Sequence, residues 1–156
     1  MFDKDTKNKT IICKCLYLQN VITNKMVVVD ANIFLAVILN EPEKQAIINN
    51  TRGIELISPE VLPYEIGNAL TAMLMRKRLN REQIIKCFDT FNLIPLHLEH
   101  VIIARALDIA CMFNIYAYDA YYLELTERLK IPLLTLDNQM KTIAKTLNIK
   151  LIEIQL

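Results

Sequence analysis

Two short apolar runs in the chain each end in an aspartate, and a segment with a helical pattern follows each of them. Asp30 follows residues 26–29, and Asp137 follows residues 133–136. Runs this short and this apolar predict buried strands. Ligands of open α/β sheets bind at the carboxyl ends of the strands, so both carboxylates stand where chemistry can be done. An aspartate at such a position is also a common helix cap, and this structural role stays open.

A third acid, Glu65, lies within a long helical pattern over residues 59–79. Ser58 and Pro59 have the residue types of a helix cap and a first helical position. Pro63 is expected to kink this helix or to delay its regular part by one turn. Glu65 falls on a face of mostly small residues, which leaves room for a ligand beside it, although a solvated surface charge is the simpler explanation.

A fourth acid, Asp119, opens the helical pattern of residues 119–130. If these acids converge, their charges must be neutralised, because two negative charges about 4 Å apart repel by roughly 4 kcal/mol at an effective dielectric near 20. No histidine or cysteine accompanies the acids. Oxygen ligands alone favour Mg²⁺ or Mn²⁺, and one or two such ions can activate water and stabilise a departing phosphate oxygen. The predicted reaction is hydrolysis of a phosphate ester.

Short apolar runs alternate with longer periodic segments along the chain. The predicted strands are residues 27–29, 55–57, 92–96, 133–136 and 150–154. The predicted helices are residues 33–39, 43–50, 59–79, 81–91, 99–113, 119–130 and 138–147. This alternation predicts an α/β fold with a parallel sheet covered on both faces. With only two glycines in the chain, a glycine-rich phosphate loop of the P-loop or Rossmann type is excluded.

Composition indicates one domain with an appended N-terminal segment. The 156 residues are 53% apolar, enough for a sizeable core. Residues 1–25 carry five lysines and two aspartates, and we expect them to be an N-terminal extension, such as a flexible arm, before a domain of residues 26–156. That domain carries 13 basic and 15 acidic residues, so bulk charge does not mark it as a nucleic-acid binder. No run is long enough to span a membrane, and the start lacks a signal-peptide layout, which predicts a cytoplasmic protein with reduced cysteines.

Four stretches of the sequence resemble the PIN-domain nucleases. They read VVVDANIFLAVILNEPE, SPEVLPYEIGNAL, YDAYYLELTERLKIPLLTLDNQM and KLIEI, and together they extend over most of residues 26–154. The resemblance implies a three-layer α/β/α sandwich with a five-stranded parallel sheet of order 3-2-1-4-5. It also implies a ribonuclease site with one or two Mg²⁺ or Mn²⁺ ions. Its catalytic, metal-binding acids would be Asp30, Glu65, Asp119 and Asp137.

The same resemblance gives expectations for neighbouring residues and for partners. Asn32 and Thr135 match small polar positions of the family, which would orient the acids or a water. Pro95 would lie in the third strand, at the edge of the sheet. A single short PIN domain is similar to the VapC-like toxins of toxin–antitoxin pairs, which implies an RNA substrate, a small antitoxin that blocks the site, and a homodimer.

Other residues with chemical potential have simpler explanations. His97 and His100 lie around a predicted loop, and a catalytic role is not expected for either. Four basic residues gather at one helix end, where they suit the helix dipole or could contact RNA or a partner: Arg76, Lys77, Arg78 and Arg81. Four tyrosines are expected in the core or at the rim of the site rather than as platforms for bases: Tyr116, Tyr118, Tyr121 and Tyr122.

Three alternatives to a toxin nuclease stay open. The domain could be a PIN-type binding module without catalysis, although the presence of all four acids opposes that, or it could be an orphan housekeeping nuclease. A phosphatase of the haloacid-dehalogenase type also opens with an aspartate after a strand. Its chemistry normally uses a second aspartate two residues later, where this chain has Asn32. A gene for a small DNA-binding protein directly upstream would distinguish a toxin from the other nucleases.

Overall fold

The structure is a computed structural model that describes residues 25–154. Four strands and seven helices alternate along these residues. The strands are β1 (Lys25–Val29), β2 (Ile54–Pro59), β3 (His97–Glu99) and β4 (Leu133–Leu134). The helices are α2 (Ala31–Ile38), α3 (Lys44–Thr51), α4 (Leu62–Met75), α5 (Arg81–Asn92), α6 (Ile103–Phe113), α7 (Ala117–Leu129) and α8 (Asn138–Thr146). The predicted extension lies outside the described residues except for Lys25, which opens β1.

The strands form one parallel sheet in the order β3-β2-β1-β4, so β1 is an inner strand. Its last three residues, all valines, are completely buried, as expected for a parallel strand covered on both faces. Val28 pairs with Ile57 of β2 on one side and with Leu133 of β4 on the other. The carboxyl ends of β1 and β4 therefore lie side by side at the same end of the sheet.

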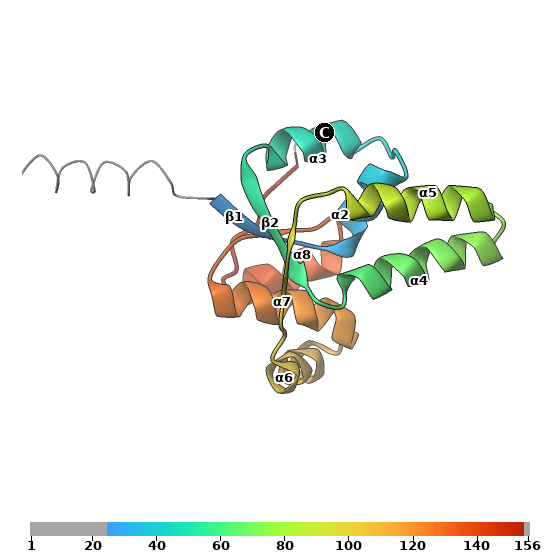
Figure 1. The fold of residues 1–156 in the computed structure, drawn as a ribbon. Helices are drawn as coiled ribbons and strands as arrows, with labels where there is room; N and C mark the ends of the chain where they lie inside the picture. The colour runs from blue at the N-terminus through green and yellow to red at the C-terminus, as the bar shows by residue number, and fades with distance from the viewer. Residues whose placement is uncertain (1–24, 155–156) are drawn as a thin grey trace, which may run out of the picture.

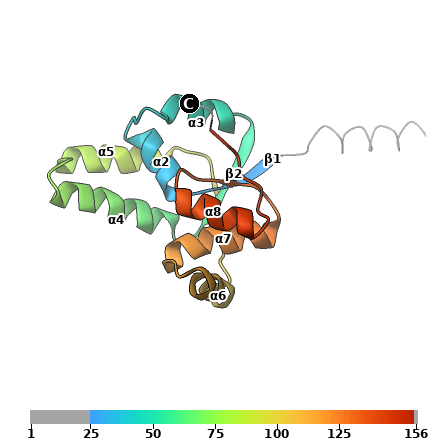
Figure 2. The same ribbon diagram turned by 180° about the vertical axis from the view of Figure 1, so that it is seen from behind.

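Helices cover the sheet on two sides, which confirms the predicted α/β architecture with a parallel sheet. Helix α7 packs against β1, β2 and β4, and α3 packs against β2. In both views α3 lies above the strands and α7 below them (Figure 1, Figure 2). Helix α6 packs on α7, farther from the sheet. Among residues 25–154, no helix combines the length and the apolar character that crossing a bilayer requires.

Helices α4 and α5 form an antiparallel pair that extends to one side of the molecule (Figure 1). The predicted start of α4 is wrong, because Ser58 and Pro59 belong to β2 and the helix begins at Leu62. The hydroxyl of Ser58 donates to the backbone oxygen of Val29 at 2.6 Å and so joins β2 to β1 instead of capping a helix. Pro63 lies in the first turn, where its missing N–H leaves no helical bond unmade, and the regular helix starts later, as predicted.

The third strand is not at the predicted position, residues 92–96. Helix α5 extends to Asn92, with Leu93 as its C-cap. Pro95 lies in the connection that follows, where its missing N–H breaks no sheet bond. Pairing with β2 begins only at His97, opposite Ile57, and the resulting strand β3 does lie at the edge of the sheet.

The predicted fifth strand does not form, so the sheet described here has four strands and the order 3-2-1-4. Residues 150–154 reach the predicted place beside β4, but they make only one isolated parallel bridge, between Leu133 and Leu151. Two hydrogen bonds support it, from Leu133 N to Lys150 O at 2.8 Å and from Ile152 N to Leu133 O at 2.9 Å. Successive residues of a strand direct their backbone groups to opposite sides. In a strand as short as β4, only Leu133 therefore has backbone groups that face residues 150–154.

Candidate active site

Asp30 follows β1 directly and is the N-cap residue of α2. Its side chain makes no capping hydrogen bond, so it does not have the helix-capping role that is common for an aspartate at this position. The backbone N–H of Asp30 donates to Leu134 O at 3.1 Å, so β4 fixes the end of β1. Only 5% of the residue is exposed. A carboxylate is thereby buried at the carboxyl ends of two neighbouring parallel strands.

Three side chains from two distant segments form a hydrogen-bonded group around Asp30. The hydroxyl of Thr135 donates to Asp30 Oδ2 at 2.6 Å, and Asn32 Nδ2 donates to the same oxygen. Asn32 Nδ2 also lies 3.3 Å from Thr135 Oγ1, while its Oδ1 accepts from Leu136 N at 3.1 Å. Thr135 and Asn32 thus hold the carboxylate of Asp30 in one orientation and tie it to the end of β4.

The surroundings of Asp30 oppose its negative charge. Its pKa is raised to about 7, far above the 3.8 typical of aspartate, and burial is the main cause. The hydrogen bond from Thr135 lowers the pKa, while the charges of Glu65 and then Asp119 raise it. These electrostatic effects require both acids to lie near Asp30, although they come from different helices. A cation at this edge would relieve the same repulsion.

Glu65 lies in the first turn of α4 and is half-buried. Burial raises its pKa above the usual range, the hydrogen bond from Tyr122 lowers it, and the charge of Asp119 raises it again. That hydrogen bond runs from the hydroxyl of Tyr122 to Glu65 Oε2 at 2.8 Å. It connects α7 to α4 directly beside Asp30.

Asp119 lies in the first turn of α7, and Asp137 is the N-cap of α8. Burial and then the charge of Asp137 raise the pKa of Asp119. Asp137 is exposed and has a capping role, because its Oδ1 accepts from Met140 N at 2.7 Å. Its own N–H donates to Thr135 Oγ1 at 3.0 Å, which connects it to the group around Asp30. The four acids thus form a series in which each influences the next.

The series is open rather than closed around one point. Within residues 25–154, no three His, Cys, Asp or Glu side chains lie close enough together to hold a metal ion. Mg²⁺ normally takes one or two carboxylates and completes its shell with waters and phosphate oxygens. The donor set here consists of oxygen atoms, and three of the four acids have raised pKa values, so its chemistry fits a hard divalent cation.

Tyr122 is a residue of this site that the sequence did not single out. It is completely buried, and besides Glu65 the charge of Asp30 raises its pKa, after burial as the main cause. The available signal was its spacing, since Tyr122 lies three residues after Asp119 and so on the same face of α7. Four tyrosines in seven residues hid this signal, because spacing alone does not show which of them faces α4.

The remaining candidates lie away from the acids. His97 Nε2 lies 2.9 Å from Glu55 Oε1, and His100 Nδ1 lies 3.5 Å from Glu60 Oε2, with both histidines exposed. The four basic residues at the turn between α4 and α5 are exposed as well. No catalytic arrangement involves these six residues within the part of the chain that the structure describes.

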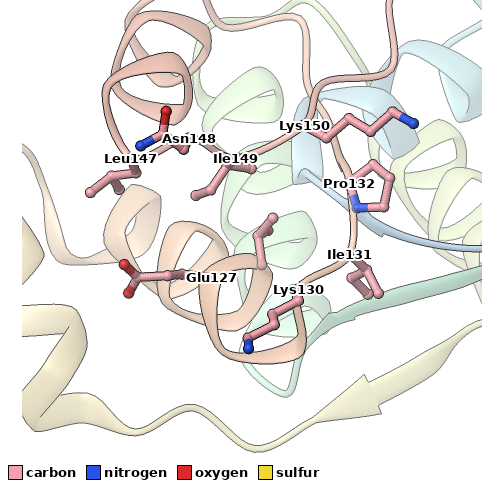
Figure 3. A pocket seen from close by; sticks show the side chains of 9 residues that line it. Glu127, Lys130, Ile131, Pro132, Leu147, Asn148, Ile149 and Lys150 are labelled. Carbon is pink, nitrogen blue, oxygen red and sulfur yellow. The ribbon is translucent and has the colours of Figure 1, made fainter.

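A cavity of 290 Å³ lies at the opposite end of β4, between the end of α7 and the segment after α8 (Figure 3). Pro132 and Ile149 line it together with two lysines, Lys130 and Lys150. The two lysine side chains extend in different directions and do not converge on a common ligand (Figure 3). None of the four acids lines this cavity, so it is separate from the candidate active site.

Comparison with known proteins places this geometry in a family. A profile of the PIN domain matches residues 27–146, which include all four acids. The chain belongs to the PIN-domain family. The match to the PIN family sets aside the haloacid-dehalogenase alternative. A search of curated protein sequences finds no match.

Solved structures support the PIN fold at low sequence identity. PAE2754 from Pyrobaculum aerophilum superposes with a TM-score of 0.62 at 20% identity, covering 76% of this chain and 86% of that one. VapBC2 from Rickettsia felis, solved bound to a DNA fragment from its promoter, gives 0.58 at 16% identity, covering 81% and 97%. FitAcB from Neisseria gonorrhoeae gives 0.58 at 12% identity, covering 82% and 97%. Because the sequence identities are this low, these structures support only the fold of this PIN domain.

Proposed function

We propose that this PIN domain is an endoribonuclease that depends on Mg²⁺ or Mn²⁺ and hydrolyses RNA phosphodiesters. The supporting observation is that Asp30, Glu65 and Asp119 lie near the carboxyl ends of β1 and β4, where their negative charges interact. The pKa of each of these acids is raised. PIN domains are generally nucleases, and neighbouring acids with raised pKa values are expected where a protein binds divalent cations.

In this proposal the four acids, Asp30, Glu65, Asp119 and Asp137, would hold one or two cations between them, each cation taking one or two carboxylates and completing its shell with waters and phosphate oxygens. A bound divalent cation stabilises charge on phosphate oxygens and makes water easier to ionise. The protein contributes orientation: Thr135 and Asn32 hold the carboxylate of Asp30, and Tyr122 holds that of Glu65. These groups are already in place before the reaction begins, so no free energy is needed to order them in the transition state. This is how they would contribute to the rate.

The charge of the domain bears on how RNA would reach the site. Residues 26–156 carry 13 basic and 15 acidic groups, so there is no general attraction for a polyanion. Contacts with RNA would then be local, from the exposed basic residues at the turn between α4 and α5, or bridged by cations at the acids. Single-stranded RNA is the proposed substrate.

The test is cleavage of a labelled single-stranded RNA by the purified protein with Mn²⁺, with Mg²⁺ and with EDTA. Asp30→Asn should lower the rate by about 10²-fold or more, comparable to removal of a key electrostatic group in other enzymes. Asp89→Asn is the matched control, since Asp89 is an exposed acid on α5. Cleavage that survives EDTA, or that Asp30→Asn leaves unchanged, would overturn the proposal. RNA binding without cleavage under all conditions would favour the non-catalytic alternative.

We further propose that the nuclease is the toxin of a toxin–antitoxin pair and that it forms homodimers. One structural neighbour is a VapBC protein, in keeping with the VapC-like resemblance of the sequence. An arginine or lysine of an antitoxin could occupy the acidic edge in place of the cation. Expression of the wild-type protein alone should then stop growth, whereas Asp30→Asn should not. Normal growth with active wild-type enzyme would favour a housekeeping nuclease instead.

A further inference from the structure

Tyr122 occupies an unusual position for a tyrosine in the middle of a buried helix. Its ring is part of the core, where no surface of the residue is exposed. Its hydroxyl nevertheless finds a charged partner, Glu65 Oε2 at 2.8 Å, on a different helix. A buried phenol normally needs a hydrogen-bond partner, but a backbone carbonyl would serve equally well. The partner here is one of the acids proposed to hold the cation.

Packing alone does not require this hydroxyl. A phenylalanine would fill the same volume, because the ring lies in the apolar core that also includes Leu123 and Leu125 of α7. The buried polar side chains of the same helix, Glu124 and Thr126, bond to groups other than the hydroxyl of Tyr122. What the hydroxyl adds is a neutral donor at pH 7 that fixes one oxygen of a flexible side chain. Glu65 has three rotatable side-chain bonds and is only half-buried, so without a partner its carboxylate would sample several positions.

We propose that Tyr122 is a positioning residue, which holds Glu65 in the orientation that binds the divalent cation without contacting the cation or the RNA itself. This inference rests on the proposed metal-dependent function and deepens it. Asp30 is held by Thr135 and Asn32 from one side, and Tyr122 does the same for Glu65 from the other. Hydrogen-bond partners of metal-binding side chains typically contribute 10- to 100-fold to metal affinity.

The first measurement is the dissociation constant for Mn²⁺, obtained by titration of the purified protein in the absence of RNA. Tyr122→Phe keeps the ring and removes the hydroxyl, and it should weaken Mn²⁺ binding by about tenfold. Tyr121→Phe is the matched control on the same helix. The ring of Tyr121 packs against Tyr118 at 5.8 Å, and no hydrogen bond from its hydroxyl occurs within residues 25–154. Its Mn²⁺ affinity should equal that of the wild type.

The second measurement asks whether Tyr122 acts through Glu65. If it does, Tyr122→Phe should have no further effect on Mn²⁺ affinity in a Glu65→Gln background, because the oriented carboxylate is already lost. A merely structural role would weaken binding equally in both backgrounds. Equal weakening, or a Tyr122→Phe protein with wild-type Mn²⁺ affinity, overturns the inference and leaves the nuclease proposal standing. Wild-type protein that binds no Mn²⁺ overturns both.

A crystal structure of the wild-type protein with Mn²⁺ supplies a test that does not depend on the folding of a variant. The hydroxyl of Tyr122 should remain within hydrogen-bond distance of Glu65 while that carboxylate contacts the ion. A Glu65 side chain that has left Tyr122 to reach the ion would overturn the inference.

Discussion

At the scale of single residues, burial opposes the negative charge of Asp30. Its carboxylate accepts hydrogen bonds from Thr135 and Asn32, yet its pKa still lies at about 7 because burial and two nearby acids oppose ionisation. The hydrogen bonds to this carboxylate are therefore not enough to compensate for the lost water. Near neutral pH the metal-free protein holds a mixture of protonated and charged Asp30.

This conflict predicts a pH dependence of stability in EDTA. The folded-state pKa of Asp30 is about 7 and the unfolded value is 3.8, so between those values only the folded protein retains the proton. The free energy of unfolding should fall as pH rises from 4 to 7, by at most about 4 kcal/mol from this group, and then level off. Urea unfolding at several pH values measures it. Asp30→Asn should flatten the curve, and an unchanged slope in that variant would contradict the prediction.

A second prediction concerns Thr135, whose hydroxyl bonds the charged form of Asp30 at 2.6 Å. Thr135→Val keeps the shape of the side chain and removes that bond, so it should raise the pKa of Asp30 further. The variant should lose about 1 to 3 kcal/mol of stability, with a greater loss at pH 8 than at pH 5. Thr142→Val, at an exposed threonine on α8 that bonds its own helix, is the control. A loss independent of pH would show that packing, or the bond from Asp137 N to Thr135 Oγ1, rather than the bond to Asp30, is responsible.

The places of the four candidate acids at strand ends and on helices could be predicted from the sequence, whereas the contacts around them could not. Asp30 and Asp137 follow recognisable strands, and a carboxylate at a strand end is visible in the order of residues. The bond between Tyr122 and Glu65 joins residues 57 positions apart on two helices. Which tyrosine makes it depends on the rotation of α7 against the sheet, and helical spacing does not determine that rotation.

At the scale of the elements, α7 connects most of the structure. It packs against three strands and against α6 and α8. Its second half carries a buried ion pair: Arg128 Nε lies 3.0 Å from Glu124 Oε1, and the carboxylate of Glu124 is completely buried. Arg128 also donates to His100 O at 2.5 Å, and Ile102 N donates to Glu124 Oε2 at 3.4 Å. The pair therefore fixes the segment that leads into α6.

Breaking this pair from one side should be worse than removing it completely. Arg128→Met leaves a buried carboxylate without its partner and should cost about 3 kcal/mol of stability. The double variant Glu124→Gln/Arg128→Met should be more stable than Arg128→Met alone, because no charge remains buried and the glutamine can still accept from Ile102 N. Urea unfolding of both variants and of the wild type measures the order. A double variant less stable than Arg128→Met would contradict this account.

Elements with a strong internal pattern were predictable, and those defined by their neighbours were not. All seven predicted helices are present, with ends displaced by up to a few residues. The third strand shifted from residues 92–96 to β3 because a strand begins where pairing with β2 begins, not where the apolar run begins. The fifth strand is reduced to one bridge because β4 is too short to pair on its outer side.

At the scale of the whole molecule, the acids of the candidate site lower the stability of the folded domain when no cation is bound. The fold of the PIN domain brings together acids from the end of β1, from α4 and from α7, and their negative charges repel one another. The burial of the apolar core compensates for the stability that this repulsion removes. A ligand that binds only the folded state adds its binding free energy to stability. The same acids that weaken the empty domain should therefore make its stability respond to cations.

This reasoning predicts thermal stabilisation by Mn²⁺. At a free concentration 100 times the dissociation constant, binding adds about 2.7 kcal/mol. For a protein of this size that corresponds to a rise of roughly 5 to 10 °C in Tm. The rise should be larger at pH 8 than at pH 5, because at pH 5 a cation must displace the proton that Asp30 holds up to about pH 7. Calorimetry of the wild type at both pH values, with Asp30→Asn as the variant that should lose most of the shift, measures this. Melting curves that coincide with and without Mn²⁺ at pH 8 would mean that the acids at the ends of β1 and β4 do not share a cation.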